Sequence, residues 1–379
     1  MTRSRVTLLV CTIIILVVVG LMVLNVRESY YSAKQIFYYR IQDTLDYTAK
    51  SLDCIKPIYD IADDSPGTIV KTDSYDSSTW LMFETLNRID TLMNSIQFPK
   101  NIKYIFGVAG TDNLVSKSML AITLRTFYDS DTLNNMMPLT YIMENGIDKD
   151  RFLTDYRGGI YIMKKNIQRQ EGCLITDNRH TILAGFESGD YAVVQELLQD
   201  PLLVNGRKIN IRIYILIVCA PGSETKMYMY NDGFMYYTPQ NFVPKSLVSE
   251  ENITTGYIDR QVYVDNPLTF QDLLLSLSSP INSNLLYNNI LALMKSISIP
   301  YISIFNNANK QFPGTKFQIY GCDVAPSMSY SVKVMEINKG PDLGYKDARD
   351  KELKKNMVRE ALGIVGILPP SSSSQFIKL

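Results

Sequence analysis

Histidine is almost absent from this sequence of 379 residues, in which His180 is the single example. Histidine-based zinc sites, Ser-His-Asp catalysis and Cys-His catalysis all need an imidazole beside the reacting group. A lone histidine nearly excludes these classes of enzyme. Cysteine is also sparse: the five cysteines are scattered and form no Cys-x-x-Cys pair, a pattern typical of free thiols in a reducing compartment.

The chain also lacks an excess of charge. It contains 38 basic and 38 acidic residues, so no overall field attracts it to nucleic acid, and no basic patch is interleaved with aromatic residues. We therefore do not expect nucleic acid as a partner. Hydrophobic residues make up 46% of the chain, which is enough for one large or two medium packed domains.

One long apolar run lies near the N-terminus. Residues 6–26 carry no charge and are long enough to cross a bilayer as a helix. A cleaved signal peptide has a shorter apolar region, of roughly 7–15 residues, followed by small residues at a cleavage site that this sequence lacks. We therefore predict an uncleaved transmembrane anchor and a single-pass membrane protein. The basic residues around the run and the free thiols favour a cytosolic position for residues 30–379.

Three further segments follow from the pattern along the chain. Residues 30–100 have mixed charge and helical spacing, which predicts a stalk and an N-terminal helical region. Residues 101–368 alternate strand-like and helix-like patterns and predict a domain of mixed α and β structure. Residues 369–379, rich in proline and serine, predict a disordered tail. Strands are expected over residues 158–165, 191–198, 209–220, 225–233, 317–324 and 331–338.

Acidic and amide side chains meet in the last two of these strands. Glu336 and Asn338 are two positions apart, so a strand projects them to the same side. If the two strands form a hairpin that turns near Ser329 and Tyr330, Asp323 lies roughly opposite Glu336. Two carboxylates and an amide oxygen on one face suit Mg²⁺. Polar residues on the solvent-facing side of a hairpin would produce the same pattern.

Basic residues in other predicted strands have the spacing to face a shared site. Lys208, Asn210 and Arg212 alternate with isoleucines, so one face of their strand is apolar and the other carries two cations and an amide. Lys164 ends another predicted strand. A surface strand could carry the same residues, whereas a strand lining a phosphate site would need them to neutralise phosphate charge.

Two long motifs resemble the tubulin–tyrosine ligase-like family. Residues 201–217, PLLVNGRKINIRIYILI, are similar to the family's PLLI-GRKFDLRIYVLV signature. Residues 317–343, FQIYGCDVAPSMSYSVKVMEINKGPDL, are similar to its FELFGFDIMLD and PWLLEVNSSPSL segments. Weaker similarities extend the match, in the same order, over roughly residues 104–345. The resemblance implies an ATP-grasp fold with mostly antiparallel sheets and a nucleotide site between two lobes.

The resemblance also implies roles for individual residues. Arg212 would stabilise the γ-phosphate during its transfer, and the ligands of Mg²⁺ would be Asp323, Glu336 and Asn338. The residues implied for ATP are Lys164 at the phosphates, Arg169 in a lid loop over residues 166–172, Gln195, Glu196, Leu197 and Leu198 at the adenine, and Lys208 and Asn210 beside them.

The implied reaction forms an amide bond between a free amino acid and a carboxylate of a protein, with ATP consumed through an acyl phosphate. Tubulin is the acceptor that the family suggests. Some positions depart from the family pattern: Asn210 replaces an aspartate, Leu197 a tyrosine, and Met235 an arginine on the acceptor side. Two alternatives therefore stay open, an ATP-binding pseudoenzyme acting as a membrane-attached interaction module and a small-molecule peptide ligase of the ATP-grasp class.

Overall fold

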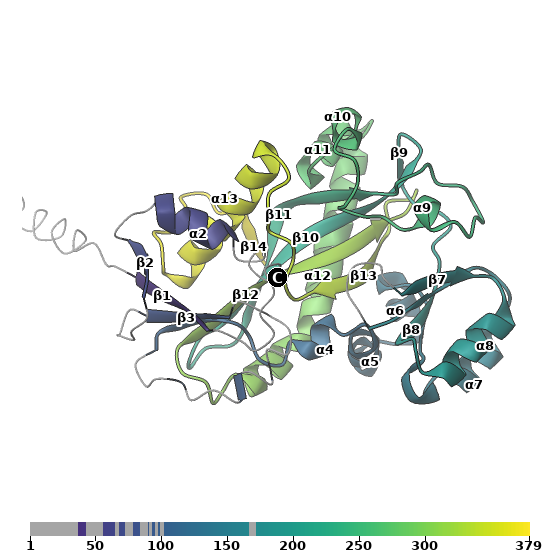
Figure 1. Ribbon diagram of the computed structural model, residues 1–379, viewed down its shortest axis with the longest axis horizontal. Coiled ribbons are helices and arrows are strands. Elements are labelled where there is room, and N and C mark those ends of the chain that lie inside the picture. The colour runs from purple at the N-terminus through teal and green to yellow at the C-terminus, as the bar shows by residue number, and fades with distance from the viewer. Residues whose placement is uncertain are drawn as a thin grey trace, which may run out of the picture.

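Helices and strands are interspersed along the chain in the computed structural model, which describes residues 37–42, 56–64, 68–72, 79–83, 90, 93–94, 98, 102–166 and 172–379 (Figure 1). The strands are β1 (Phe37–Gln42), β2 (Ile69–Lys71), β3 (Thr79–Phe83), β4 (Tyr104–Phe106), β5 (Thr140–Ile142), β6 (Tyr161–Lys164), β7 (Cys173–Thr176), β8 (Val193–Glu196), β9 (Leu203–Val204), β10 (Arg207–Cys219), β11 (Lys226–Tyr237), β12 (Thr315–Pro326), β13 (Val332–Asn338) and β14 (Phe376–Lys378). The helices are α2 (Lys56–Asp64), α4 (Asp112–Val115), α5 (Lys117–Phe127), α6 (Ser130–Met136), η2 (Glu144–Gly146), α7 (Lys149–Asp155), α8 (Arg179–Ser188), α9 (Ser249–Asn252), α10 (Val262–Asp265), α11 (Phe270–Ser276), α12 (Pro280–Ala308) and α13 (Ala348–Val365).

These strands form two sheets. The larger has ten strands in the order β14-β11-β10-β12-β4-β3-β1-β2, with β13 paired to β12 and β9 paired to β10. The smaller has the order β5-β8-β6-β7, and its pairs are antiparallel. The predicted mixture of α and β structure is confirmed, and the two sheets are consistent with the ATP-grasp fold that the motifs imply.

One edge of the large sheet is parallel. β12 pairs with β4, β4 with β3, and β1 with both β3 and β2 in parallel registers, whereas the pairs among β9 to β14 are antiparallel. The sheets are therefore mostly antiparallel, as expected, except at this parallel edge of the large sheet. Parallel neighbours require long crossover connections, and this edge is accordingly built from segments distant from β12 in the sequence.

The described part of residues 30–100 is mixed rather than the helical stalk expected from the sequence. It contains α2, but β1, β2 and β3 are strands of the large sheet. The β3 segment, Thr-Trp-Leu-Met-Phe, is too short to show helical periodicity. Its aromatic and β-branched residues favour a strand once a neighbouring strand is available.

The C-terminal residues 369–379 also differ from the expected disordered tail. Phe376–Lys378 form β14 and pair with Tyr228–Tyr230 of β11. Phe376 is buried, and its ring centroid lies 5.0 Å from that of Tyr230. A strand ladder and an aromatic contact therefore order a segment whose proline and serine content suggests disorder.

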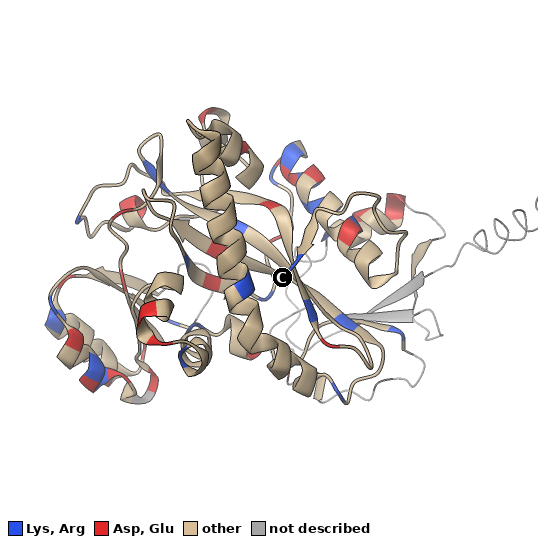
Figure 2. Ribbon diagram, turned by 180° about the vertical axis from the view of Figure 1, so that it is seen from behind, with Lys and Arg blue, Asp and Glu red and all other residues tan. Residues whose placement is uncertain are grey.

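The central strand β10 divides its side chains between two hydrophobic cores. The core on the side of α12, the long helix that faces the viewer in Figure 2, takes Ile209, Ile211, Ile213, Ile215 and Ile217. The core on the opposite side, which α13 helps to close, takes Tyr214, Leu216 and Val218. Lys208, Asn210 and Arg212 follow the alternation of this second face, so they lie on the side of the sheet away from α12.

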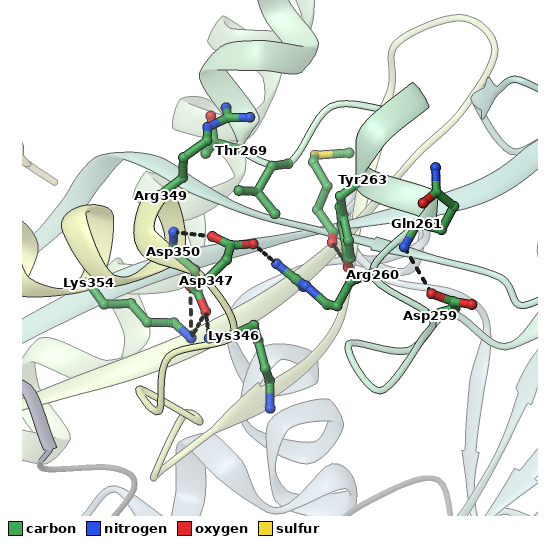
Figure 3. Close-up of polar contacts among 12 residues, drawn as sticks. Asp259, Arg260, Gln261, Tyr263, Thr269, Lys346, Asp347, Arg349, Asp350 and Lys354 are labelled. Atoms are coloured by element: carbon green, nitrogen blue, oxygen red, sulfur yellow. Dashed lines mark hydrogen bonds and ion pairs between the residues drawn. The ribbon is translucent and has the colours of Figure 1, made fainter.

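Helix α13 is held at its start by caps and ion pairs (Figure 3). Asp347 accepts a hydrogen bond from the Asp350 backbone N–H at 2.9 Å, and its second oxygen pairs with Arg260. Lys354 and Asp350 form a buried pair with 2.9 Å between Nζ and Oδ1. Lys354 also donates to the carbonyl of Gly344 at 2.7 Å. Because Gly344 follows shortly after β13, this hydrogen bond connects α13 to the segment that follows the β12–β13 hairpin.

Within the described residues, no helix combines the length and the apolar character that a membrane crossing needs. The longest of them, α12, carries asparagine and serine throughout its length. By this finding the predicted single-pass membrane localisation, with its cytosolic domain, is wrong. The apolar run at residues 6–26, on which that prediction depended, lies outside the described residues.

Candidate functional site

A buried ion pair between two neighbouring strands forms the centre of the site. Arg212 of β10 lies opposite Asp323 of β12 in the antiparallel register. The Arg212 Nε donates to Asp323 Oδ1 at 2.5 Å, and its Nη2 donates to Oδ2 at 2.9 Å. Both side chains are only 8% exposed. A two-point contact of this kind fixes the plane of the guanidinium, which a lysine could not reproduce.

Two neighbours set the position of the Arg212 guanidinium. The ring centroid of Tyr236, on β11, lies 4.9 Å from the guanidinium carbon in a cation–π contact. Gly321, on β12, leaves room for the side chain, since a Cβ there would lie 2.7 Å from Arg212 Cδ and 2.9 Å from its Nη1. Any larger residue at position 321 would therefore displace the guanidinium.

The β12–β13 hairpin brings two further polar side chains to Asp323. Asp323 pairs with Glu336 across the hairpin, and Gly321 pairs with Asn338. The Asn338 amide nitrogen donates to Glu336 Oε1 at 3.2 Å and to Asp323 Oδ2 at 3.5 Å. Tyr330, in the connecting turn, has a φ of +63°. The convergence of two carboxylates and an amide predicted from the strand pattern is confirmed, and the turn lies where it was expected.

Burial and neighbouring charges act differently on the two carboxyl groups. Burial raises the pKa of Asp323 to about 6, against the opposing effect of Arg212 and with a further contribution from Glu336. Burial also disfavours the charged form of Glu336, but Lys117 and Lys164 outweigh it and lower the pKa of this carboxyl. Glu336 is therefore held as a carboxylate whose charge is balanced by cations from other elements.

Two lysines act on the charge of Glu336 in this cluster, and a third lysine lies near one of them. Lys117, in the first turn of α5, places its Nζ 3.9 Å from Glu336 Oε2. Lys164, at the end of β6, is buried, which lowers the pKa of its ammonium, while Glu336 acts to raise it. Burial lowers the pKa of Lys208, on β10, to about 8, and the charge of Lys164 adds to the effect. The small sheet, the large sheet and α5 thus each direct a cation to one region.

Two of these predicted site residues have buried polar groups without a protein partner in the part of the chain that the structure describes. The Asn210 Oδ1 atom is buried and accepts no hydrogen bond. Lys164 is 8% exposed, and its ammonium has neither an ion pair nor a hydrogen bond within these residues. Buried polar groups are normally hydrogen-bonded and buried cations paired. The open acceptor of Asn210 lies two positions from Lys208 on β10, and Lys164 is close enough to Lys208 to act on its pKa. A ligand that carries hydroxyl and phosphate groups would suit these side chains.

The residues expected at an adenine lie at the end of β8 and just after it. Gln195 is buried, and its Nε2 donates to Thr140 Oγ1 at 2.9 Å while its Oε1 has no partner among the described residues. Glu196 is exposed. The carbonyl of Leu198 accepts a hydrogen bond from Lys208 Nζ at 3.4 Å. The segment expected at the adenine and the strand that carries Lys208 are therefore in direct contact.

An apolar surface lies on the same face of the small sheet as Lys164. It consists of Ile160, Ile162, Ile175 and Leu197, with Cys173 packed beside it. Lys164 shares the alternation of Ile160 and Ile162 along β6. Apolar side chains next to a cation are the combination that a nucleoside triphosphate requires of a binding site.

The structure adds Lys117 and Tyr236 to the residues found from the motifs. Lys117 begins α5 directly after the capping residue Ser116, and its position in a helical first turn is the only local signal that it carries. In the sequence, nothing distinguishes Tyr236 from any other aromatic residue of a strand. Their relation to the site depends on how α5 and β11 pack, which no local pattern contains.

Two other features considered in the sequence analysis, Arg169 with its loop and position 235, are not part of the described site. Arg169 lies outside the described residues, as does most of the loop 166–172. Met235, at the position where the resembling family has an arginine, is fully buried in β11. Its carbonyl accepts a hydrogen bond from the Tyr263 hydroxyl at 2.9 Å. Position 235 therefore contributes to the core and presents no charge to the site.

The match to known families agrees with this geometry. Residues 109–375, well over half of the chain, match the model described as TTL: Tubulin-tyrosine ligase family. The chain belongs to the tubulin-tyrosine ligase family. The site residues described above all lie within the matched range.

Relatives within this family are distant and longer. The chain is 23% identical to Tubulin monoglutamylase TTLL4 of Homo sapiens over 198 residues, which covers 48% of this chain and 16% of that protein. It is 23% identical to Probable tubulin polyglutamylase TTLL9 of Rattus norvegicus over 184 residues, covering 46% and 38%. It is 23% identical to Tubulin polyglutamylase TTLL7 of Mus musculus over 208 residues, covering 48% and 22%. The matched region thus spans well under half of each of these relatives.

Proposed function

We propose that this member of the family is an ATP- and Mg²⁺-dependent ligase that joins a free amino acid to a carboxylate of a protein. The observation that carries the proposal is the convergence of Asp323, Glu336 and Asn338 with the cations of Lys117 and Lys164. Membership of the family supports the same class of reaction. Because the relatives are named tubulin glutamylases, we propose tubulin as the acceptor and glutamate as the amino acid to test first.

Each group of residues has a part in holding the substrates. The adenine would lie against the apolar surface of the small sheet, and Lys164 and Lys208 would neutralise the phosphates. The open Oδ1 of Asn210 would accept a hydrogen bond from a hydroxyl of the nucleotide. Asp323, Glu336 and Asn338 would hold Mg²⁺, which when bound supplies positive charge between the phosphate oxygens.

The reaction would proceed in two displacements. In the first, an oxygen of the acceptor carboxylate forms a bond to the γ-phosphorus, and the bond from that phosphorus to the bridging oxygen of ADP breaks. Arg212 and Lys117 stabilise the charge on the transferred phosphoryl group. In the second, the amine of the amino acid forms a bond to the acyl carbon, phosphate leaves and the amine gives up its proton. Because the side chains only orient reactants and balance charge, no histidine is needed.

A second candidate is an ATP-binding pseudoenzyme that serves as an interaction module. The buried Met235 favours it, because the position where the resembling family has an acceptor-side arginine has no charge here. The two candidates share nucleotide binding and differ in amide formation. An assay of ATP turnover with tubulin and glutamate, beside an assay of nucleotide binding, separates them: binding without amide formation would favour the pseudoenzyme.

Replacing Glu336 with glutamine is expected to weaken Mg²⁺-dependent nucleotide binding strongly while the protein stays folded. The exchange keeps the shape of the side chain but removes the charge that Lys117 and Lys164 stabilise. Loss of a carboxylate ligand should weaken binding of Mg-ATP by about a hundredfold, as measured by titration calorimetry. Circular dichroism would report the fold.

The matched control is Glu352→Gln, which makes the same exchange on the exposed surface of α13. We expect it to bind Mg-ATP as the wild type does. Equal affinity in the Glu336→Gln variant and the wild type would overturn the metal assignment.

The affinity for Mg-ATP is expected to fall as the pH rises above about 8. Burial places the pKa of Lys208 at about 8, so its ammonium is charged below that pH and attracts phosphate, and it loses this charge above it. The loss should weaken binding by about tenfold between pH 7 and pH 9.5. In Lys208→Arg the guanidinium stays charged, so the decrease should flatten. A decrease of the same size in this variant would assign the titration to another group.

A further inference from the structure

A cavity lies between the turn that joins β10 to β11 and the C-terminal end of α12. Its volume is about 530 Å³, which is within the range of cavities that hold small molecules. Cys219, which lines it, ends β10 seven residues after Arg212, so about 23 Å of strand separates the two. Cys219 also belongs to the core on the side of α12, whereas Arg212 lies on the other face of the sheet. The cavity is therefore separate from the proposed ligase site.

The lining of this cavity includes a buried cation. Lys316, near the start of β12, is only 2% exposed. Its Nζ donates to the carbonyls of Phe312 at 3.1 Å and Gly314 at 3.0 Å, which leaves one N–H of the ammonium for another partner. Among the described residues, no carboxylate acts on its charge. Buried cations are normally paired with an anion, so Lys316 lacks a counter-charge.

The neighbouring thiol does not supply that charge. Cys219 lies opposite Lys316 in the register of β10 and β12, and each group acts on the pKa of the other. Burial raises the pKa of the Cys219 thiol to about 11, so the thiol is neutral at physiological pH. Its sulfur accepts a hydrogen bond from the Thr225 hydroxyl at 3.2 Å. Because Cys219 and Phe312 both line the cavity, the ammonium beside them lies at its wall.

Two further hydrogen-bond donors line the same cavity. The backbone N–H of Thr225 donates to Asn306 Oδ1 at 2.7 Å, which identifies the oxygen end of this amide. The NH₂ group of Asn306 then points away from Thr225, and it has no partner in the part of the chain that the structure describes. Lys310, at the exposed rim, forms no ion pair with the described residues either. Two ammonium groups and an amide NH₂ are all donors, which is the lining that an anion requires.

The rest of the lining limits the charge and the character of that anion. Glu224 lies at the rim, and the C-terminal end of α12, where a helix carries partial negative charge, lies beside the cavity. Both disfavour a ligand with two negative charges, such as the phosphate dianion. Ala220, Pro221 and Phe312 offer apolar contacts. These features together favour a single carboxylate attached to a small apolar body.

We propose that this cavity binds a small organic monocarboxylate, with its carboxylate at Lys316 and Asn306 and its apolar part against Phe312. The carboxylate supplies the counter-charge that Lys316 lacks and accepts hydrogen bonds from the ammonium and from the amide NH₂. The site is independent of the proposed ligase site. Failure of either proposal would leave the other unaffected.

Titration calorimetry of the full chain with benzoate tests the chemical class of the ligand. Benzoate should bind saturably at one site, and benzamide, its uncharged counterpart, should bind at least about tenfold more weakly, because hydrogen bonds to a charged group are stronger. Inorganic phosphate should also bind more weakly than benzoate. No binding of benzoate, equal binding of benzamide, or tighter binding of phosphate would each overturn the proposal.

The variant Asn306→Asp tests where the benzoate binds. This exchange keeps the acceptor for the Thr225 backbone N–H but replaces the amide NH₂ with a negative charge, so the affinity for benzoate should fall by at least about tenfold. The matched control is Asn288→Asp, the same exchange at an exposed position of α12 outside the cavity, which should bind benzoate as the wild type does. Circular dichroism would report the fold of both variants. An unchanged affinity in Asn306→Asp would place the benzoate elsewhere in the protein and overturn the proposal.

Discussion

Replacing Arg212 with methionine is expected to reduce the free energy of unfolding by about 3–5 kcal/mol, because Asp323 would be left buried without its counter-charge. The two side chains form a bidentate pair, and each is only 8% exposed. Urea unfolding at pH 8 measures the loss. Any ligase turnover should disappear in the same variant, since no other side chain reproduces the planar fork beside Tyr236.

A double-mutant cycle distinguishes an unpaired charge from a simple packing defect. Asp323→Leu removes the second partner, so Arg212→Met/Asp323→Leu should be more stable than the sum of the single losses predicts, by about 2 kcal/mol or more. Additive losses would contradict the assignment.

The stability of Arg212→Met should also depend on pH. Burial already raises the pKa of Asp323 to about 6, and removal of Arg212 raises it further. A carboxyl group whose pKa is higher in the folded state loses stabilisation as the pH rises through that value. The variant should therefore be closer to the wild type at pH 5 than at pH 8. A deficit that is equal at both values would show that Asp323 is not the group left unpaired.

Replacing Lys354 with methionine is expected to destabilise the protein by a similar amount, about 3–5 kcal/mol, because it leaves Asp350 charged and fully buried. The Asp350 side chain is 0% exposed, and that of Lys354 is 4% exposed. The exchange also removes the hydrogen bond to the Gly344 carbonyl, so the segment after β13 loses one of its attachments. Urea unfolding at neutral pH measures the effect.

The control for this prediction is an ion pair that is exposed to solvent, unlike the buried pair of Lys354 and Asp350. Arg349, one turn earlier in α13, pairs with Asp272, and its side chain is 59% exposed. Arg349→Met should cost about 0–1 kcal/mol, since an exposed pair is screened by solvent. Similar losses for Arg349→Met and Lys354→Met would show that burial does not set the value of these pairs.

The amino-acid sequence determined the features that depend on neighbours within one strand. The two-residue spacing of Glu336 and Asn338 places them on one side of β13, and the alternation in Lys208, Asn210 and Arg212 separates them from the isoleucines of β10. The hairpin between β12 and β13 is also local, so the pairing of Asp323 with Glu336 could be predicted. Two long motifs that include these strands carry the resemblance to the family in the sequence itself.

Tertiary structure alone decided which of these faces meet. Arg212 contacts Asp323 across a separation of 111 residues because β10 and β12 are neighbours in the large sheet. The hydrophobic pattern of a strand predicts which of its sides is apolar, but it does not predict which strand lies next to it. Lys117 reaches Glu336 through the packing of α5. The strands β3 and β14 form because partners elsewhere in the chain complete their hydrogen bonds. Sequence periodicity records the direction of a side chain, whereas its partner across the fold depends on sheet order and register, which are set by the whole chain.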